Sequence, residues 1–101
     1  MKSKTLSKSK KEGTITLQLF VSGMSPKSME AIENIRRLCD NQLKNLYHLE
    51  IIDIYIHPEA AIEHHIIFCP SLIKRTPPPQ RILIGTLADP EMVLKALGVK
   101  K

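Results

Sequence analysis

The chain has 101 residues, which is the length of one domain that can bury a modest hydrophobic core. Its formal net charge is +5, and its apolar share of 43% is ordinary for a folded protein. No apolar run reaches the length needed to cross a membrane, and no apolar stretch follows the basic start as it would in a secretory signal. We therefore expect a cytoplasmic protein that is neither secreted nor embedded in a membrane.

The positive charge is concentrated at the start of the chain. Five lysines and one glutamate within residues 1–12 carry +4, which leaves +1 for all the residues that follow. A Lys- and Ser-rich stretch with few apolar residues is typical of a solvated terminus. We predict a disordered basic tail over residues 1–12 and a single domain over residues 13–101, with no nucleic-acid partner.

The first half of the domain has the pattern of a strand, a helix and a second strand. Residues 14–21 alternate apolar and polar positions, which predicts a strand. Ser25-Pro26 is a helix start, because a hydroxyl caps free N–H groups and proline fits where no donor is needed. Residues 47–56 carry apolar groups on both faces, which predicts a strand covered on both sides. The helix between them is expected to bury a stripe at helical spacing: Met29, Ile32, Ile35, Arg36, Leu38, Cys39 and Leu43.

The second half is divided by prolines. Residues 58–65 predict a short helix, 68–73 a short strand that contains a proline, and 81–85 another short strand. The proline run at 76–79 is a stiff turn, and a last helix begins at Asp89-Pro90 and ends at Gly98. The order β-α-β-(α)-β-β-α belongs to the α/β class and is the plan of thioredoxin.

The two cysteines do not form the redox motif of that plan. Thioredoxin carries a CxxC pair at the turn after its first strand, where a helix N-terminus lowers a thiol pKa. Residues 23–27 contain no cysteine, which excludes dithiol chemistry at that turn. Cys39 and Cys69 are expected to be reduced side chains rather than a disulfide. Cys69 precedes Pro70, at a position that faces this turn in thioredoxin folds, and a lone oxidisable thiol there is an alternative.

Other polar residues do not form a catalytic or metal-binding set. Ser25 and Ser28 lack a base and an orienting partner, so capping is the expected role. Three histidines between positions 57 and 65 lack a ligand pair one helical turn apart, and we expect them to be exposed on a surface helix. Asp53 is expected to accept hydrogen bonds at a strand end rather than to be a tuned carboxylate. The sequence thus predicts no enzyme, no metal and no cofactor.

Four segments, in order and without gaps, together carry a family signature. They are residues 19–28 (LFVSGMSPKS), 47–54 (YHLEIIDI), 68–74 (FCPSLIK) and 77–85 (PPPQRILIG). Together they resemble the KaiB family of circadian-clock proteins over about residues 14–97. The resemblance implies a non-enzymatic adaptor that docks on a KaiC-like hexameric ATPase. It also implies two arrangements of the second half, a thioredoxin-like one and a ground-state one found in oligomers, so that a dimer or tetramer is compatible with it.

The resemblance implies roles for two sets of residues. The expected partner contacts are Met24, Lys27, Lys74 and Arg81. The expected determinants of a fold switch are Pro70, Pro77, Pro78, Pro79 and Ala96. Prolyl isomers differ little in energy and exchange slowly, so they can separate two packings. Ala96 stands where family members carry glycine, and alanine favours a helix by about 1 kcal/mol. This favours the thioredoxin-like form.

Departures from the family pattern bear on which partner and which process we expect. Glu50 and Ile82 stand where the family has a lysine and an arginine, so KaiA is an unlikely partner. These changes favour a non-cyanobacterial homologue that acts in stress adaptation or a rhythm-like process. Two alternatives are a thioredoxin-like redox or stress protein that uses Cys69, and a freestanding sensor domain of a KaiC-interacting histidine kinase.

Overall fold

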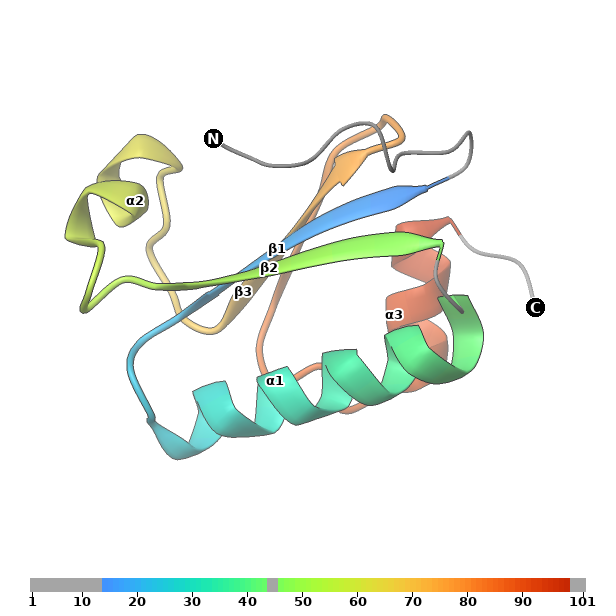
Figure 1. Ribbon diagram of the computed structural model, residues 1–101, viewed down its shortest axis with the longest axis horizontal. Coiled ribbons are helices and arrows are strands. Elements are labelled where there is room, and N and C mark those ends of the chain that lie inside the picture. Colours follow the sequence, from blue (N-terminus) through green and yellow to red (C-terminus); the bar gives the residue numbers. More distant parts are fainter. Residues whose placement is uncertain (1–13, 44–45, 99–101) are drawn as a thin grey trace.

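A four-stranded mixed sheet forms the centre of the structure, a computed structural model that describes residues 14–43 and 46–98 (Figure 1). Its strands lie in the order β2-β1-β3-β4, with β2 parallel to β1, β3 antiparallel to β1 and β4 antiparallel to β3. Their bounds are β1 (Ile15–Val21), β2 (Tyr47–Asp53), β3 (Ser71–Thr76) and β4 (Arg81–Ile84). This is the predicted topology. The basic tail predicted for residues 1–12 lies outside the described residues.

Helix α1 (Pro26–Leu38) begins where the sequence predicts. The Ser25 hydroxyl accepts a hydrogen bond from the backbone N–H of Ser28, and a π-helical turn (Cys39–Leu43) extends the helix. The buried side is formed by Ser28, Ala31, Ile35, Leu38, Cys39 and Leu43. The predicted stripe is correct at its last positions and wrong at Met29 and Arg36, which are exposed because Ser28 and Ala31 face the sheet instead.

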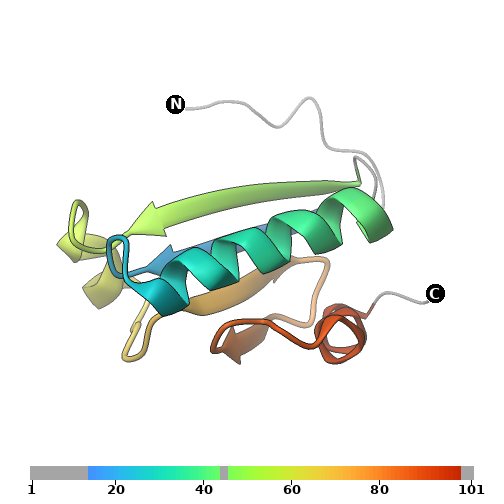
Figure 2. The same ribbon diagram turned by 90° about the horizontal axis from the view of Figure 1, so that it is seen from below.

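The main core lies on one face of the sheet, beneath α1 and α3 (Pro90–Leu97) (Figure 2). The alternating residues of β1 supply its floor: Ile15, Leu17, Leu19 and Val21. Asp89 caps α3 through the N–H of Met92, and Gly98 ends it with a left-handed backbone at φ 79°, as predicted. Residues 90–97 form a helix, which is their conformation in the thioredoxin-like arrangement of the second half. Ala96 is half-buried in this helix.

Among residues 14–43 and 46–98, the helix on the opposite face of the sheet packs at one end of it. Phe20 and Ile73 pack there with Ala60 of the short helix α2 (Pro58–Glu63). Strand β2 is an edge strand whose apolar residues are half-buried, so the prediction that it is covered on both faces is wrong. A single six-residue helix is too short to cover the whole sheet.

The end of β2 and both ends of β3 lie three residues from their predicted positions, and β3 extends to Thr76 instead of ending at position 73. Strand β2 ends at Asp53 instead of position 56, because the chain turns there and the N–H groups of Ile56 and His57 bond to the Asp53 carbonyl. Strand β3 begins at Ser71 instead of position 68, because Pro70 has no N–H to contribute to a ladder. The earlier end of β2 and the later start of β3 lengthen the connecting segments at the same end of the sheet. No helix among the described residues has the length and apolar character to span a membrane.

Candidate functional site: the loop end of the sheet

Three connecting segments meet at the end of the sheet where β1 and β2 terminate and β3 begins (left in Figure 1). They are residues 22–25 after β1, 54–57 after β2 and 64–70 before β3. We call these three segments the loop end. In the thioredoxin plan, this is the end that carries the redox site.

The carboxylate of Asp53 joins two of these segments. Its Oδ1 atom accepts hydrogen bonds from the backbone N–H of Gly23 and from that of Tyr55, each at 2.9 Å. A third bond, from the N–H of Ile54 to the carbonyl of Val21 at 2.9 Å, lies beside them. The sequence-based prediction that Asp53 accepts hydrogen bonds at the end of a strand is therefore confirmed.

Gly23 allows this close approach. Its φ is +61°, a left-handed conformation that other residues adopt at a cost of about 1–2 kcal/mol. A side-chain Cβ at this position would lie 2.7 Å from Cδ2 of the Tyr55 ring. The aromatic ring therefore lies directly against the backbone of the turn, which brings the two segments into one continuous surface.

Three serine hydroxyls fix the same turn from the side of α1. The buried Ser28 hydroxyl accepts a hydrogen bond from the N–H of Ser22 at 3.1 Å, and the N–H of Ser28 donates to the Ser25 hydroxyl at 3.3 Å. All three residues serve the turn and the helix cap. No base hydrogen-bonds to these hydroxyls among the described residues, so their arrangement is structural, as the sequence indicates.

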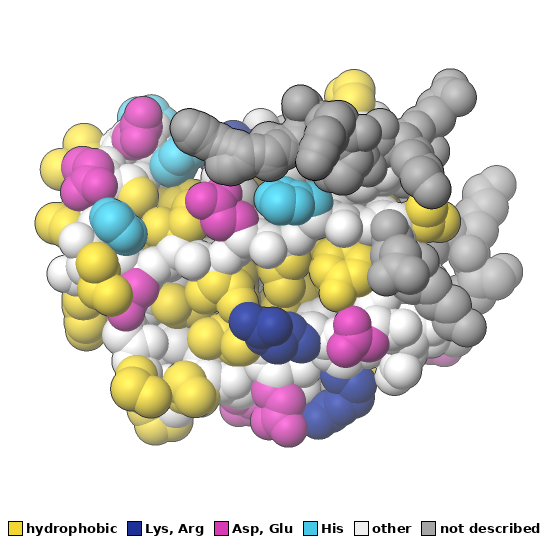
Figure 3. All heavy atoms as spheres, viewed as in Figure 1, with side chains coloured by type: hydrophobic (Ala, Val, Ile, Leu, Met, Phe, Trp, Pro, Cys, Tyr) yellow, Lys and Arg dark blue, Asp and Glu magenta, His cyan; other side chains and the backbone are white. Residues whose placement is uncertain are grey.

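Large apolar side chains point to solvent at the loop end. Met24 is 80% exposed, and the other exposed members are Tyr55, Ile56, Ile67 and Phe68. Hydrophobic side chains gather with histidine and acidic side chains at this side of the molecule in the space-filling view (Figure 3). The hydroxyl of Ser71 donates to the carbonyl of Phe68 and closes the turn that carries Phe68. Exposed apolar side chains that gather at one side of a protein are typical of interaction sites.

The predicted contact residues are divided between separate places. Met24 is exposed in the loop end and Lys27 is exposed beside it, whereas Arg81 is exposed at the opposite end, where the proline turn joins β3 to β4. Lys74 is not on the surface: it is only 4% exposed, and its Nζ donates to the carbonyl of Leu97 at 3.3 Å. Its amine holds the C-terminal end of α3 against the sheet, which corrects the expectation of a surface contact.

The exposure of Tyr55, Ile56 and Phe68 at the loop end differs from the sequence-based prediction. The pattern predicted Ile56 as part of a covered strand and Phe68 as the start of the next one. The signal that could have revealed them is Asp53 itself, since an aspartate that bonds the N–H two residues later starts a turn. A strand that ends at Asp53 leaves the following aromatic and aliphatic side chains in loops.

The thiol of Cys69 is half-buried beside this site, in front of a cis peptide bond to Pro70. Burial raises the pKa of the Cys69 thiol, and the negative charge of Asp53 raises it further. Burial likewise raises the pKa of Cys39, with help from Asp40, to about 12. Both cysteines are free, as predicted, and both are held in the protonated form that is a poor nucleophile.

The predicted exposure of the histidines is correct for His57 and His65 but wrong for His64. The His64 ring packs against Phe20 with ring centroids 5.2 Å apart, and its Nδ1 accepts a hydrogen bond from the guanidinium of Arg75. It is half-buried because α2 ends directly over the small second core. His64 therefore helps to attach α2 to the sheet.

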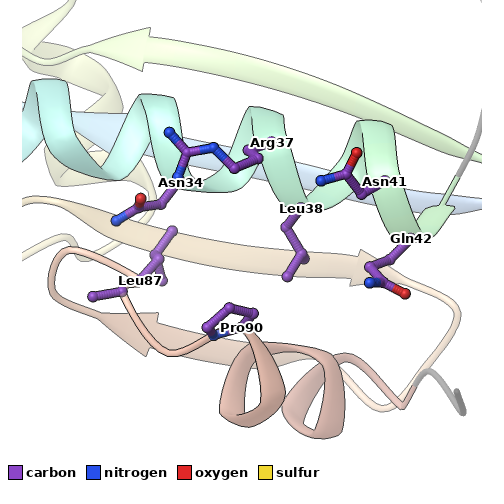
Figure 4. Close-up of a pocket in the computed structure, with 8 residues that line it drawn as sticks. Asn34, Arg37, Leu38, Asn41, Gln42, Leu87 and Pro90 are labelled. Atoms are coloured by element: carbon purple, nitrogen blue, oxygen red, sulfur yellow. The ribbon is translucent and has the colours of Figure 1, made fainter.

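Apart from the loop end, a hollow lies between α1 and the segment that leads to α3 (Figure 4). Leu38 and Leu87 are buried in its lining, and Arg37, Asn41 and Gln42 lie along its rim. The side-chain amide of Asn34 donates to the carbonyl of Thr86 at 2.8 Å and ties the two walls together. With a volume of about 100 Å³ it is smaller than the pockets that hold cofactors or drug-sized ligands.

A comparison with protein families shows to which family the chain belongs. The model described as the KaiB domain matches residues 18–99. The chain belongs to the KaiB family. It is 41% identical over 85 residues to circadian clock protein KaiB3 of Synechocystis sp., covering 84% of this chain and 83% of that protein. It is 42% identical over 86 residues to the circadian clock oscillator protein KaiB of Prochlorococcus marinus, covering 85% of this chain and 82% of that protein.

Solved structures agree on the fold. The chain superposes on chloroplastic thioredoxin z with a TM-score of 0.71 at 11% identity, covering 85% of this chain and 77% of that one. It superposes on the N-terminal domain of SasA from Synechococcus elongatus with a TM-score of 0.67 at 19% identity, covering 97% of this chain and 91% of that one. The predicted KaiB membership and thioredoxin-like fold are confirmed. The chain is a homologue of the circadian clock protein KaiB, and members of this family are non-enzymatic clock components.

Replacing Asp53 tests its hydrogen bonds. Asp53→Ala leaves the N–H groups of Gly23 and Tyr55 without their acceptor, and we expect the free energy of unfolding to fall by about 1–3 kcal/mol. Asp53→Asn keeps an oxygen at the same place and should lose less. Urea denaturation followed by circular dichroism measures both. Asp40→Ala is the control, because among the described residues that carboxylate accepts one hydrogen bond, from the exposed Tyr47 hydroxyl. An Asp53→Ala protein as stable as the parent would contradict this role.

The raised pKa of Cys69 predicts slow reaction with alkylating agents at neutral pH. Burial and the Asp53 charge both disfavour the thiolate, so the rate with iodoacetamide should rise only at a higher pH than for an ordinary thiol. Asp53→Asn removes one of the two causes and should shift that rise to lower pH. Insulin reduction should be absent in the parent and in Cys69→Ser. Fast alkylation at neutral pH, or insulin reduction that Cys69→Ser abolishes, would support the redox alternative instead.

Proposed function

We propose that this KaiB-family chain is a non-enzymatic adaptor that binds a KaiC-type hexameric ATPase through the loop end, in cytoplasmic clock-like or stress-adaptation regulation. Family membership supports the class of partner. The observation that carries the binding role is the set of exposed apolar side chains at the loop end, Met24 and Tyr55 foremost. Exposure of an apolar side chain to water is unfavourable. Docking that buries it stabilises the complex by roughly 25 cal/mol per Å² of apolar area removed from water.

The geometry of the loop end favours binding because it is organised before any partner arrives. Asp53 holds the turn of Met24 and the turn of Tyr55 together, and the serine hydroxyls fix the first turn to α1. Surfaces that are already ordered lose less conformational entropy on association. Lys27 adds a positive charge beside the apolar residues, which suits a partner surface that is apolar with an acidic margin.

The raised pKa of Cys69 weighs against the redox alternative, since it leaves the thiol in its unreactive form. We also infer that KaiA is not a partner, because Glu50 and Ile82 replace basic residues of the family on exposed sites. Arg81 stays a proposed contact at the opposite end of the sheet. Pro70, Pro77, Pro78, Pro79 and Ala96 stay the proposed determinants of a second arrangement.

Co-elution with a KaiC homologue from the same genome tests the proposal. We expect a complex on size-exclusion chromatography, measured with and without ATP. Met24→Glu should weaken it about tenfold or more, a loss of at least about 1.4 kcal/mol, because a charge would replace an apolar contact. Met92→Glu is the matched control, since Met92 is also exposed, at 53%, but lies on α3. No complex under either condition, or equal effects of the two variants, would contradict the proposal.

A further inference from the structure

Helix α2 is attached to the sheet by few contacts. Of its six residues, Ala60 is the buried one, and it packs against Phe20 and Ile73 of the sheet. Among residues 14–43 and 46–98, one side-chain hydrogen bond connects residues 57–65 to a strand, and it joins the guanidinium of Arg75 to the ring of His64. A helix this short is not stable in water by itself, so its place depends on these contacts.

The hydrogen bond from Arg75 requires a neutral histidine. The nitrogen atoms of a guanidinium donate hydrogen bonds and do not accept them, so Nδ1 of His64 is the acceptor and carries no proton. The ring proton is then on Nε2. When the ring gains a second proton, both of its nitrogen atoms become donors and Arg75 loses its acceptor. The charged ring would also lie against the positive charge of Arg75.

The guanidinium of Arg75 is fixed by two further hydrogen bonds. Its Nε donates to the side-chain oxygen of Gln18 on β1 at 2.6 Å, and its Nη1 donates to that of Gln80, directly before β4, at 3.2 Å. The amide of Gln18 in turn donates to the carboxylate of Glu50 on β2 at 3.1 Å. Arg75 therefore stays against the sheet when His64 becomes charged, and it is His64, with α2, that moves away.

The charged groups around the His64 ring lie on α2, β2 and β3. Arg75 on β3 contacts the ring directly. Glu63 at the end of α2 lies 3.9 Å from Nε2, but its side chain is 73% exposed, so water weakens its attraction for a charged ring. Glu50 on β2 is linked to the ring through Gln18 and then Arg75. The charge nearest to the ring is thus the positive one.

The other elements that pack against the ring present uncharged side chains. Phe20 on β1 has its ring centroid 5.2 Å from that of His64. Ile82 and Ile84 of β4 line the groove beside the ring. The next residue, His65, is the other titratable group in this lining, and it is exposed. None of these uncharged side chains supplies a negative charge that would hold a protonated His64 in place.

We propose that the contact between His64 and Arg75 is a pH-sensitive switch, in which a neutral His64 holds α2 on the sheet and a protonated His64 releases it. Histidine is the side chain that ordinarily changes its charge between pH 5 and 8. Helix α2 is therefore held at pH 8 and released as the pH falls to 5. Because Ile67 and Phe68 follow within four positions, release also displaces two exposed apolar residues of the loop end. The switch operates in the free chain and does not depend on the proposed partner.

NMR on the parent chain tests the switch without any substitution. At pH 8 we expect the ¹⁵N signals of the His64 ring to show the proton on Nε2, and nuclear Overhauser contacts to connect Ala60 with the Phe20 ring. At pH 5 those contacts should be lost, while contacts within the main core beneath α1 and α3 persist. A proton on Nδ1 at pH 8, or contacts between Ala60 and Phe20 that are equal at both pH values, overturns the proposal.

A double-mutant cycle measures the interaction itself at each pH. His64→Leu, Arg75→Met and the double variant are unfolded with urea at pH 8 and pH 5, and the coupling is the effect that the two single variants do not explain. We expect a coupling that favours folding about tenfold or more at pH 8 and is lost or reversed at pH 5. Titration of the other histidines is common to all four proteins and cancels.

The same cycle with His65→Leu in place of His64→Leu is the matched control, because His65 is exposed and Arg75 bonds to His64 instead. It should show no coupling at either pH. A His64–Arg75 coupling that is absent at pH 8, that is equal at both pH values, or that His65 reproduces overturns the proposal.

Discussion

The hydrogen bonds that Asp53 accepts from two backbone amides are the interaction on which the rest of the site depends. They accompany the left-handed turn at Gly23 and the place of the Tyr55 ring against that turn. A further hydrogen bond, from the N–H of Ile54 to the carbonyl of Val21, joins the ends of β1 and β2 beside them. Together these bonds join the segments after β1 and after β2 into one surface at the loop end, and α1 begins directly behind it under the cap of Ser25.

This surface occupies the place at which thioredoxins carry out redox chemistry, yet its own chemistry is different. The turn from Gly23 to Lys27 contains no cysteine, and the thiol of Cys69 is held protonated by burial and by the charge of Asp53. What the fold retains is a set of loops at one end of a sheet, here carrying exposed apolar side chains. The raised pKa of Cys69 and the exposed apolar side chains agree with membership of a family of non-enzymatic clock components.

Much of the fold could be predicted from local signals because those signals act locally. The alternation in β1, the caps at Ser25 and Asp89 and the terminal Gly98 each act within a few residues, and the structure contains them all. The site was harder to predict. Whether Lys74 lies at the surface depends on α3, a helix more than fifteen positions later in the chain, and whether Phe68 is exposed depends on how little of the sheet α2 covers. Burial set by distant segments leaves no local pattern in the sequence.

Amide hydrogen exchange measured by NMR on the folded protein tests the role of Asp53 most directly. The structure predicts that the amides of Gly23 and Tyr55 are both protected in the parent chain, because each donates to the same carboxylate oxygen. In Asp53→Ala both should lose protection together, while the amides in the middle of β1 keep theirs. If either amide exchanges freely in the parent chain, or if only one loses protection in the variant, the two turns are not joined through Asp53.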